Sequence, residues 1–202
     1  MNELKSIVDL TNAFSKFPSI GAKTAERMAY AILNMDKQSI DFLITSIENA
    51  TTKIHPCPIC GILTEDDKCQ VCKDVNRDHS QCIVIPSSKD ALLFESMNFH
   101  GIYHVLGGEI SSYHGLTPDK LKIQELIKRI EDEKIKEIII ATNPNIEGDT
   151  TALYLAKILE NKDVIVSRIG FGLPVGGQLD YADSLTIKRS FDNRTSYKKE
   201  IK

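Results

Sequence analysis

The N-terminal part of the chain carries apolar residues at helical spacing in three successive segments. Apolar residues recur every three or four positions over residues 4–14 and again over residues 25–33, which predicts two helices. The few residues between them include Pro18 and Gly21 and predict a tight turn. Asp36 is placed to cap a third helix, with apolar positions at Ile40, Leu43, Ile44, Ile47 and Ile54. We therefore expect a helical hairpin followed by a third helix.

From residue 82 onward, short apolar runs alternate with helical stretches. The runs predict strands at residues 83–85, 103–106, 137–141 and 164–166. Helices are expected at residues 90–97, 117–130 and 151–159. Such alternation is typical of a mainly parallel sheet with right-handed crossovers, in which ligand sites lie at the carboxyl ends of the strands. Cys82, at the first strand, is expected to be a small buried hydrophobic residue.

Two pairs of cysteines lie between these regions, each with the spacing Cys-x-x-Cys. The four residues are Cys57, Cys60, Cys69 and Cys72. Two such pairs can surround one Zn²⁺ with four thiolates at about 2.3 Å, which leaves no position for a water molecule. We therefore expect a structural zinc site on which the folding of this segment depends. A redox Cys-x-x-Cys and two disulfides are the alternatives, but the first normally occurs once beside a βαβ unit and the second is typical of secreted chains.

Composition and charge limit the classes of partner. With 42% hydrophobic and 26% charged residues, the chain has the composition of a globular protein. It has no apolar run long enough to cross a membrane and starts with no signal peptide, so we expect a cytoplasmic location and no membrane partner. A formal charge of -3 means that any binding to nucleic acid must use local basic patches. Residues 186–202 hold six bases and two acids, for which we expect a solvated, frayed tail in preference to a DNA contact.

The segment at residues 17–25 resembles the helix-hairpin-helix motif of DNA-binding proteins. In that motif, glycine lets backbone N–H groups approach a phosphate, and the next helix N-terminus adds a favourable partial charge. Gly21 fits this pattern, whereas Ser19 stands where the first glycine usually lies and offers a hydroxyl to the phosphate. Lys23 and Arg27 share one face of the second helix. We predict DNA contact by these four residues; the alternative is a simple bundle in which Lys23 forms a surface ion pair with Glu26.

The segment after the third strand of the predicted sheet resembles the Toprim signature of topoisomerases, primases and some nucleases. Residues 143–149 read Asn-Pro-Asn-Ile-Glu-Gly-Asp. The resemblance places metal-binding aspartates at Asn143 and Asn145, and a glutamate at Pro86. Since only Glu147 and Asp149 remain, we expect the fold without metal-dependent chemistry. The asparagines and these acids would form a docking surface for a partner or a weak Mg²⁺ site. Alternatively, Asp149 merely caps the next helix and Glu147 lies in the loop before it.

Residues 170–183 hold four glycines and a proline, which predicts a constrained loop without an ATP-binding phosphate motif. Taken in order, the hairpin, the cysteines, the asparagine-substituted Toprim segment and this loop resemble the bacterial recombination mediator family RecR. The resemblance covers nearly the whole chain and departs at Ser19 and Pro86. It implies a multi-part α+β protein with a helix-hairpin-helix region for DNA binding and dimerisation (1–54), a four-cysteine zinc finger (55–80), an α/β Toprim domain with a mainly parallel sheet (81–175) and a short C-terminal segment (176–202).

This resemblance implies a non-enzymatic protein of the RecF pathway of recombinational DNA repair. Members of the family bind DNA, form dimers and ring-like tetramers, and act with RecO and RecF to load RecA onto gapped single-stranded DNA. For this chain, the resemblance implies one structural Zn²⁺, homo-oligomers and association with the nucleoid. Two alternatives remain open: a Mg²⁺-dependent Toprim nuclease or primase, which the asparagines disfavour, and a zinc-dependent interaction module with no role on DNA.

Overall fold

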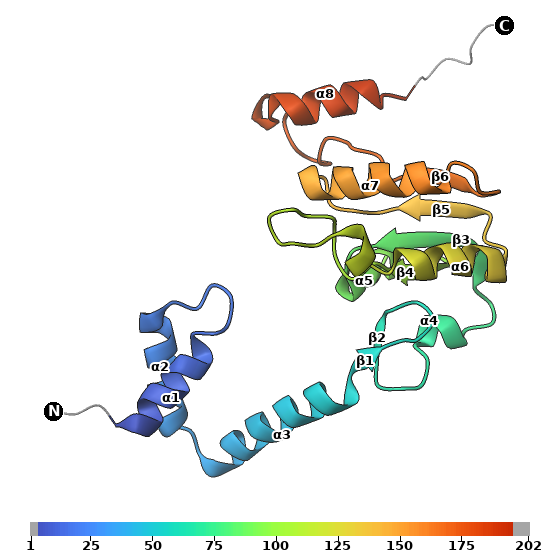
Figure 1. Cartoon of the computed structure of the whole chain (residues 1–202). Helices are drawn as coiled ribbons and strands as arrows, with labels where there is room; N and C mark the ends of the chain where they lie inside the picture. The colour runs from blue at the N-terminus through green and yellow to red at the C-terminus, as the bar shows by residue number, and fades with distance from the viewer. Residues whose placement is uncertain (1–3, 196–202) are drawn as a thin grey trace, which may run out of the picture. The chain divides into compact units, whose positions relative to one another are not determined.

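The computed structural model describes residues 4–195, which fall into two compact units divided between Ile54 and His55. The first unit consists of the helices α1 (Lys5–Phe14), α2 (Ala22–Leu33) and α3 (Lys37–Lys53). Figure 1 shows α1 and α2 side by side, and Ala25 and Ala29 of α2 are fully buried. The predicted helical hairpin is therefore confirmed. The predicted cap of α3 is confirmed as well, because Asp36 accepts a hydrogen bond from Ser39 N–H at 2.9 Å.

The second unit contains a small hairpin and a four-stranded sheet. In the hairpin, β1 (His55–Pro56) pairs antiparallel with β2 (Leu63–Thr64), and the short helix α4 (Gln70–Lys73) follows. The larger sheet has the strand order β4-β3-β5-β6 and consists of β3 (Asp78–Ile85), β4 (Gly101–Val105), β5 (Glu137–Ile140) and β6 (Ile165–Arg168). All neighbouring strands of this sheet are parallel, which confirms the predicted fold class.

Alternate residues of β3 serve two separate hydrophobic cores. Cys82 and Val84 belong to the core that the sheet forms with α6 (Ile123–Glu133) and α7 (Ile146–Leu159). Ile83 and Ile85 belong to the other core, which includes α5 (Ala91–Glu95) and the cysteine hairpin. Cys82 is fully buried as predicted, and burial raises the pKa of its thiol to about 12. The sheet thus lies between a layer of helices and a layer that contains the paired cysteines.

The helices of this unit differ from their predicted bounds. The stretch predicted as a helix from residue 90 divides into a 3-10 turn, η1 (Ser88–Asp90), and the short α5. The stretch predicted from residue 117 opens with another 3-10 turn, η2 (Pro118–Lys120), and α6 follows it. Helix α7 begins well before the predicted start at residue 151, because Asn145 caps it by accepting a hydrogen bond from Gly148 N–H at 2.8 Å. Glu147 and Asp149 therefore lie in the first helical turn, and the interpretation of Asp149 as the cap is wrong.

The C-terminal part contains a helix that the sequence pattern did not predict. Residues 170–183 are irregular as predicted, apart from the 3-10 turn η3 (Leu179–Tyr181). Asp183 caps α8 (Ser184–Asp192) by accepting hydrogen bonds from the N–H groups of Leu185 and Thr186, both at 3.0 Å. The prediction of a frayed tail from residue 186 is therefore wrong for α8, and its part at residues 196–202 lies outside the described residues. None of the described helices is both long enough and apolar enough to span a membrane.

Candidate functional site

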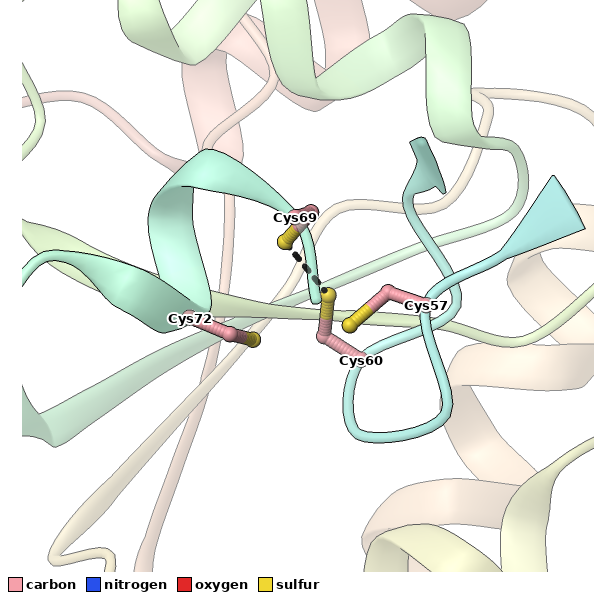
Figure 2. A group of neighbouring side chains, drawn as sticks. All are labelled: Cys57, Cys60, Cys69 and Cys72. Carbon is pink, nitrogen blue, oxygen red and sulfur yellow. Dashed lines mark hydrogen bonds between the residues drawn. The ribbon is translucent and has the colours of Figure 1, made fainter. Parts of the chain in front are cut away.

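The four paired cysteines converge on one point. Figure 2 shows their thiols directed toward one another, two from the turn that follows β1 and two from the start and body of α4. All four sulfur atoms lie within 4.8 Å of one another, and the Sγ atoms of Cys60 and Cys69 are 3.4 Å apart. Four thiolates bound tetrahedrally to one zinc ion at about 2.3 Å would be separated by about 3.8 Å. The donor set and its spacing therefore fit Zn²⁺. All five cysteines of the described residues are free of disulfides.

Backbone hydrogen bonds shape the first cysteine turn and attach it to the sheet. Cys57 N–H donates to Ile62 C=O at 2.7 Å, and Gly61 N–H donates to Cys57 C=O at 2.9 Å. Gly61 has a positive φ of 80°, and a Cβ atom at this position would lie 2.9 Å from Val105 Cβ. Val105 N–H donates to Cys60 C=O at 2.8 Å. Glycine at position 61 thus permits both the turn and its close approach to the edge strand β4.

The pKa values of Cys57, Cys60 and Cys69 are shifted in different directions. Burial alone would raise the pKa of Cys57, but backbone N–H groups of Cys69, Cys60 and Ile59 lower it to about 6. Hydrogen bonding to Cys72 and burial raise the pKa of Cys60 well above its ordinary value. Burial also raises the pKa of Cys69, to about 11. A bound divalent cation would favour the thiolate form of all four and displace their protons.

The helical hairpin presents an open helix N-terminus. Gly21 is the N-cap of α2, where no side chain caps the helix and no acid lies in the first turn. Lys23 and Arg27 are exposed on the first two turns, and within the described part of the chain no ion pair joins Lys23 to Glu26. Ser19 is exposed and has a φ of 66°, the left-handed region that favours glycine. The structure therefore places the predicted DNA-contacting residues at one end of the hairpin.

The predicted Toprim residues lie at the carboxyl edge of the sheet, but they do not form a cluster of free carboxylates. Asn143 N–H donates to the carboxylate of Glu109 at 2.7 Å, and the side chain of Asn145 caps α7. Both carboxylate oxygens of Asp149 accept hydrogen bonds from arginines, at 2.7 Å from Arg168 and 2.5 Å from Arg189. Partial burial alone would raise the pKa of Asp149, but the two arginines hold it below its ordinary value.

Family models match four stretches of the chain in the order of its structural parts. They describe a RecR helix-hairpin-helix (residues 7–51), a RecR zinc finger domain with four cysteine ligands (54–74), a Toprim domain (80–170) and a RecR C-terminal region (172–195). The chain is also 44% identical over 198 residues to a protein of Treponema denticola named Recombination protein RecR, an alignment that covers 98% of this chain and 100% of that relative.

The chain belongs to the RecR family. Membership confirms the resemblance drawn from the motif order and supports a role as a mediator of recombinational DNA repair. The RecR helix-hairpin-helix match indicates DNA binding by the N-terminal unit. The RecR zinc-finger match, together with the converging thiols, indicates zinc binding. None of these matches supports the expected weak Mg²⁺ site. Asp149, one of its predicted ligands, is already paired with two arginines.

Three residues at the carboxyl edge of the RecR Toprim domain were missed by the sequence reasoning: Glu109, Arg168 and Arg189. Arg168 ends β6 and so lies at the same edge as residues 143–149, a position that the predicted parallel sheet could have indicated. Glu109 lies in the loop beyond β4 and could have been found in the same way. Arg189 offered no such signal, because α8 itself was not predicted.

Proposed function

We propose that this chain is a non-catalytic DNA-binding mediator that acts with RecO and RecF to promote loading of RecA onto gapped single-stranded DNA. The observation that carries the proposal is the open N-terminus of α2, which combines uncapped N–H groups with Lys23 and Arg27. A helix N-terminus of this kind attracts phosphate through its N–H groups and its partial positive charge. Contacts to phosphates do not depend on the base sequence. This suits a mediator that must act on gaps of any sequence.

The carboxyl edge of the sheet supports the non-catalytic part of the proposal. Metal-dependent phosphodiester chemistry needs carboxylates free to hold Mg²⁺. Here amides stand at positions 143 and 145, and Asp149 is engaged by Arg168 and Arg189. The alternative of a Mg²⁺-dependent nuclease or primase is therefore not favoured. Nicking or extension of DNA by the purified protein with Mg²⁺, lost on Glu147→Gln, would overturn the non-catalytic proposal.

We further propose that one zinc ion per chain is held by all four cysteines and is structural. A shell of four thiolates leaves no open position for a substrate or a catalytic water. The zinc would fix the turn of Cys57 and Cys60 against β4 and α4, which makes it a determinant of folding.

We also propose that the chain forms homo-oligomers. Helix α3 has no buried residue, yet Ile40, Leu43, Ile44 and Ile47 follow one another on a single face, and Ile44 and Ile47 are 50% and 55% exposed. An apolar stripe of this kind favours a homodimer, in which a second copy covers it. A tetrameric ring built from such dimers would bring several hairpins to one channel, and the linked sites would raise avidity for DNA despite the chain's net charge of -3. Binding to chromosomal DNA would concentrate the protein at the nucleoid.

The central test replaces the two cations of the hairpin. We expect Lys23→Ala and Arg27→Ala each to weaken binding to gapped DNA of any sequence and to reduce the slope of log affinity against log salt by about one. Lys37→Ala is the control, since Lys37 begins α3 beyond the opposite end of α2. Fluorescence anisotropy titrations at several salt concentrations provide the measurement. If neither slope differs from that of the parent protein, Lys23 and Arg27 lie off the DNA and the hairpin is not the interface.

A further inference from the structure

Helix α8 lies against the Toprim domain without hydrophobic anchorage. None of its residues is buried, and its larger apolar side chains Leu185, Ile187 and Phe191 are 57%, 38% and 63% exposed. The preceding segment contains Gly170, Gly172 and Gly176, where an added Cβ would meet no atom within 4 Å. Since neither the helix nor the segment before it is packed into a core, polar contacts must account for the position of α8.

One carboxylate makes those contacts. Asp149, in the first turn of α7, accepts from Arg168 Nη2 at 2.7 Å through Oδ1 and from Arg189 Nη2 at 2.5 Å through Oδ2. Arg168 ends β6, and Arg189 lies on α8. Both guanidinium groups also stack on Phe171, at 4.8 Å and 4.5 Å from the ring centroid. The four side chains thus connect α7, β6, the glycine-containing segment and α8.

Phe171 and Arg189 also line an open cavity at the carboxyl edge of the sheet. Its volume is about 460 Å³, and it is lined by Thr142, Pro144, Ile169, Phe171, Asp183 and Arg189, among others. They come from the segments that follow β5 and β6 and from α8 and its cap. Crevices at the carboxyl ends of parallel strands are the usual ligand sites of such sheets. The position of α8 therefore decides how far this edge is accessible.

We propose that Asp149, Arg168, Phe171 and Arg189 form a reversible electrostatic latch that holds α8 over the carboxyl edge of the Toprim sheet. The side chains of Asp149, Arg168 and Arg189 are 29%, 24% and 26% exposed, so water and salt weaken their ion pairs. Because the hydrophobic cores contain none of these residues, opening the latch frees α8, which forms one wall of the cavity, without unfolding the sheet. Asp149 thus serves in this structure as the acceptor of two guanidinium groups.

The test compares hydrogen–deuterium exchange of the full-length protein in the parent, Arg189→Gln and Lys188→Gln. Lys188 is exposed on the same helix, and its replacement removes the same charge without touching the latch. We expect amide exchange over residues 184–192 to rise about tenfold in Arg189→Gln, to stay at the parent rate in Lys188→Gln, and to be unchanged in β3 and β5 of both. In the parent, exchange of α8 should approach that of Arg189→Gln as the salt concentration increases.

A second variant separates the latch from an effect on α7 alone. Asp149→Asn removes an acid from the N-terminus of α7 and can weaken that helix by itself. If the latch exists, the effects of the two substitutions on α8 are not additive, because both break the same contact. The amides of α8 should therefore exchange no faster in the double variant Asp149→Asn, Arg189→Gln than in Arg189→Gln alone. Parent-like exchange of α8 in Arg189→Gln overturns the proposal. So does an equal rise across the whole sheet, which would indicate a general structural role.

Discussion

At the scale of single residues, Gly148 and Gly21 are glycines for different reasons. A Cβ atom at position 148 would lie 2.0 Å from the carbonyl oxygen of Asn143, so the close packing of α7 on its preceding loop excludes any larger residue. A Cβ atom at Gly21 would meet nothing within 4 Å, and the φ of -80° there suits any residue. The fold of the described chain therefore explains Gly148 but not Gly21. An approaching phosphate supplies the missing reason for Gly21, under the proposed function.

This contrast gives a prediction for Gly21→Ala. We expect the midpoint of thermal unfolding to change little, because alanine at an N-cap costs at most about 1 kcal/mol relative to glycine. Affinity for gapped DNA should fall about fivefold, since the methyl group keeps the backbone N–H groups away from the phosphate. Gly172→Ala, at an equally open glycine of the other unit, is the control. Calorimetry and DNA titration check the two parts, and unaltered DNA affinity would show that no phosphate approaches Gly21.

At the scale of elements, the cysteine turn covers one end of the sheet edge, and two arginines cover the rest. β4 is an edge strand, and its outward-facing groups find partners outside the sheet: Val105 N–H donates to Cys60 C=O, and the carbonyl groups of Gly101 and Tyr103 accept from Arg77 and Arg129. Uncovered edge strands are prone to pair with other chains. A metal that holds the cysteine turn in shape would therefore also protect the sheet.

Removal of the zinc ligands should accordingly affect the Toprim domain as well as the cysteine turn. We expect Cys60→Ser to lose zinc, to unfold at a markedly lower temperature and to aggregate, because the Val105 end of β4 loses its cover. Cys82→Ala is the control, since Cys82 lies in the other core and should leave one zinc per chain in place. Metal analysis and thermal unfolding with and without a chelator provide the measurements. A metal-free Cys60→Ser protein that melts like the parent would contradict the proposed structural zinc.

At the scale of the whole molecule, the exposed apolar face of α3 is the feature that a single chain leaves unexplained. Hydrophobic burial drives most association between proteins, and a charge placed in an apolar interface opposes it. A second copy would cover this face. The resulting dimer would carry two hairpins, and two linked sites bind DNA more tightly than one.

The corresponding prediction concerns Ile44→Asp. We expect this variant to be monomeric at micromolar concentration and to bind gapped DNA more weakly than the parent, with its hairpin intact. Asn49→Asp introduces the same charge on the same helix, away from the apolar face, and should keep the assembly. Light scattering coupled to gel filtration provides the mass of each protein. A strictly monomeric parent would rule out the α3 interface.

Much of the architecture followed from the sequence because the forces that produce it act locally. Helical periodicity in residues 4–54 indicates the hairpin and α3, and the spacing of the four cysteines indicates their convergence. Alternation of apolar strands with helices indicates a parallel sheet, whose carboxyl edge must gather the segment around Asn143. Each of these features depends on residues that are close in the chain, or on a connection that nearly always has one geometry.

The pairing of Asp149 and the position of α8, in contrast, depend on contacts between distant parts of the chain. Asn145 and Asp149 both suit a helix cap, and the hydrogen bond from Gly148 N–H shows that Asn145 is the cap, which leaves Asp149 free to pair elsewhere. Arg189 meets Asp149 from forty positions away in sequence, through a glycine-containing segment whose path no local pattern determines. Helical periodicity and capping act between residues that are close in the chain, so the sequence alone reveals them. Charge pairing acts through space between side chains at any separation along the chain, so the pairs of Asp149 appear only once the chain is folded.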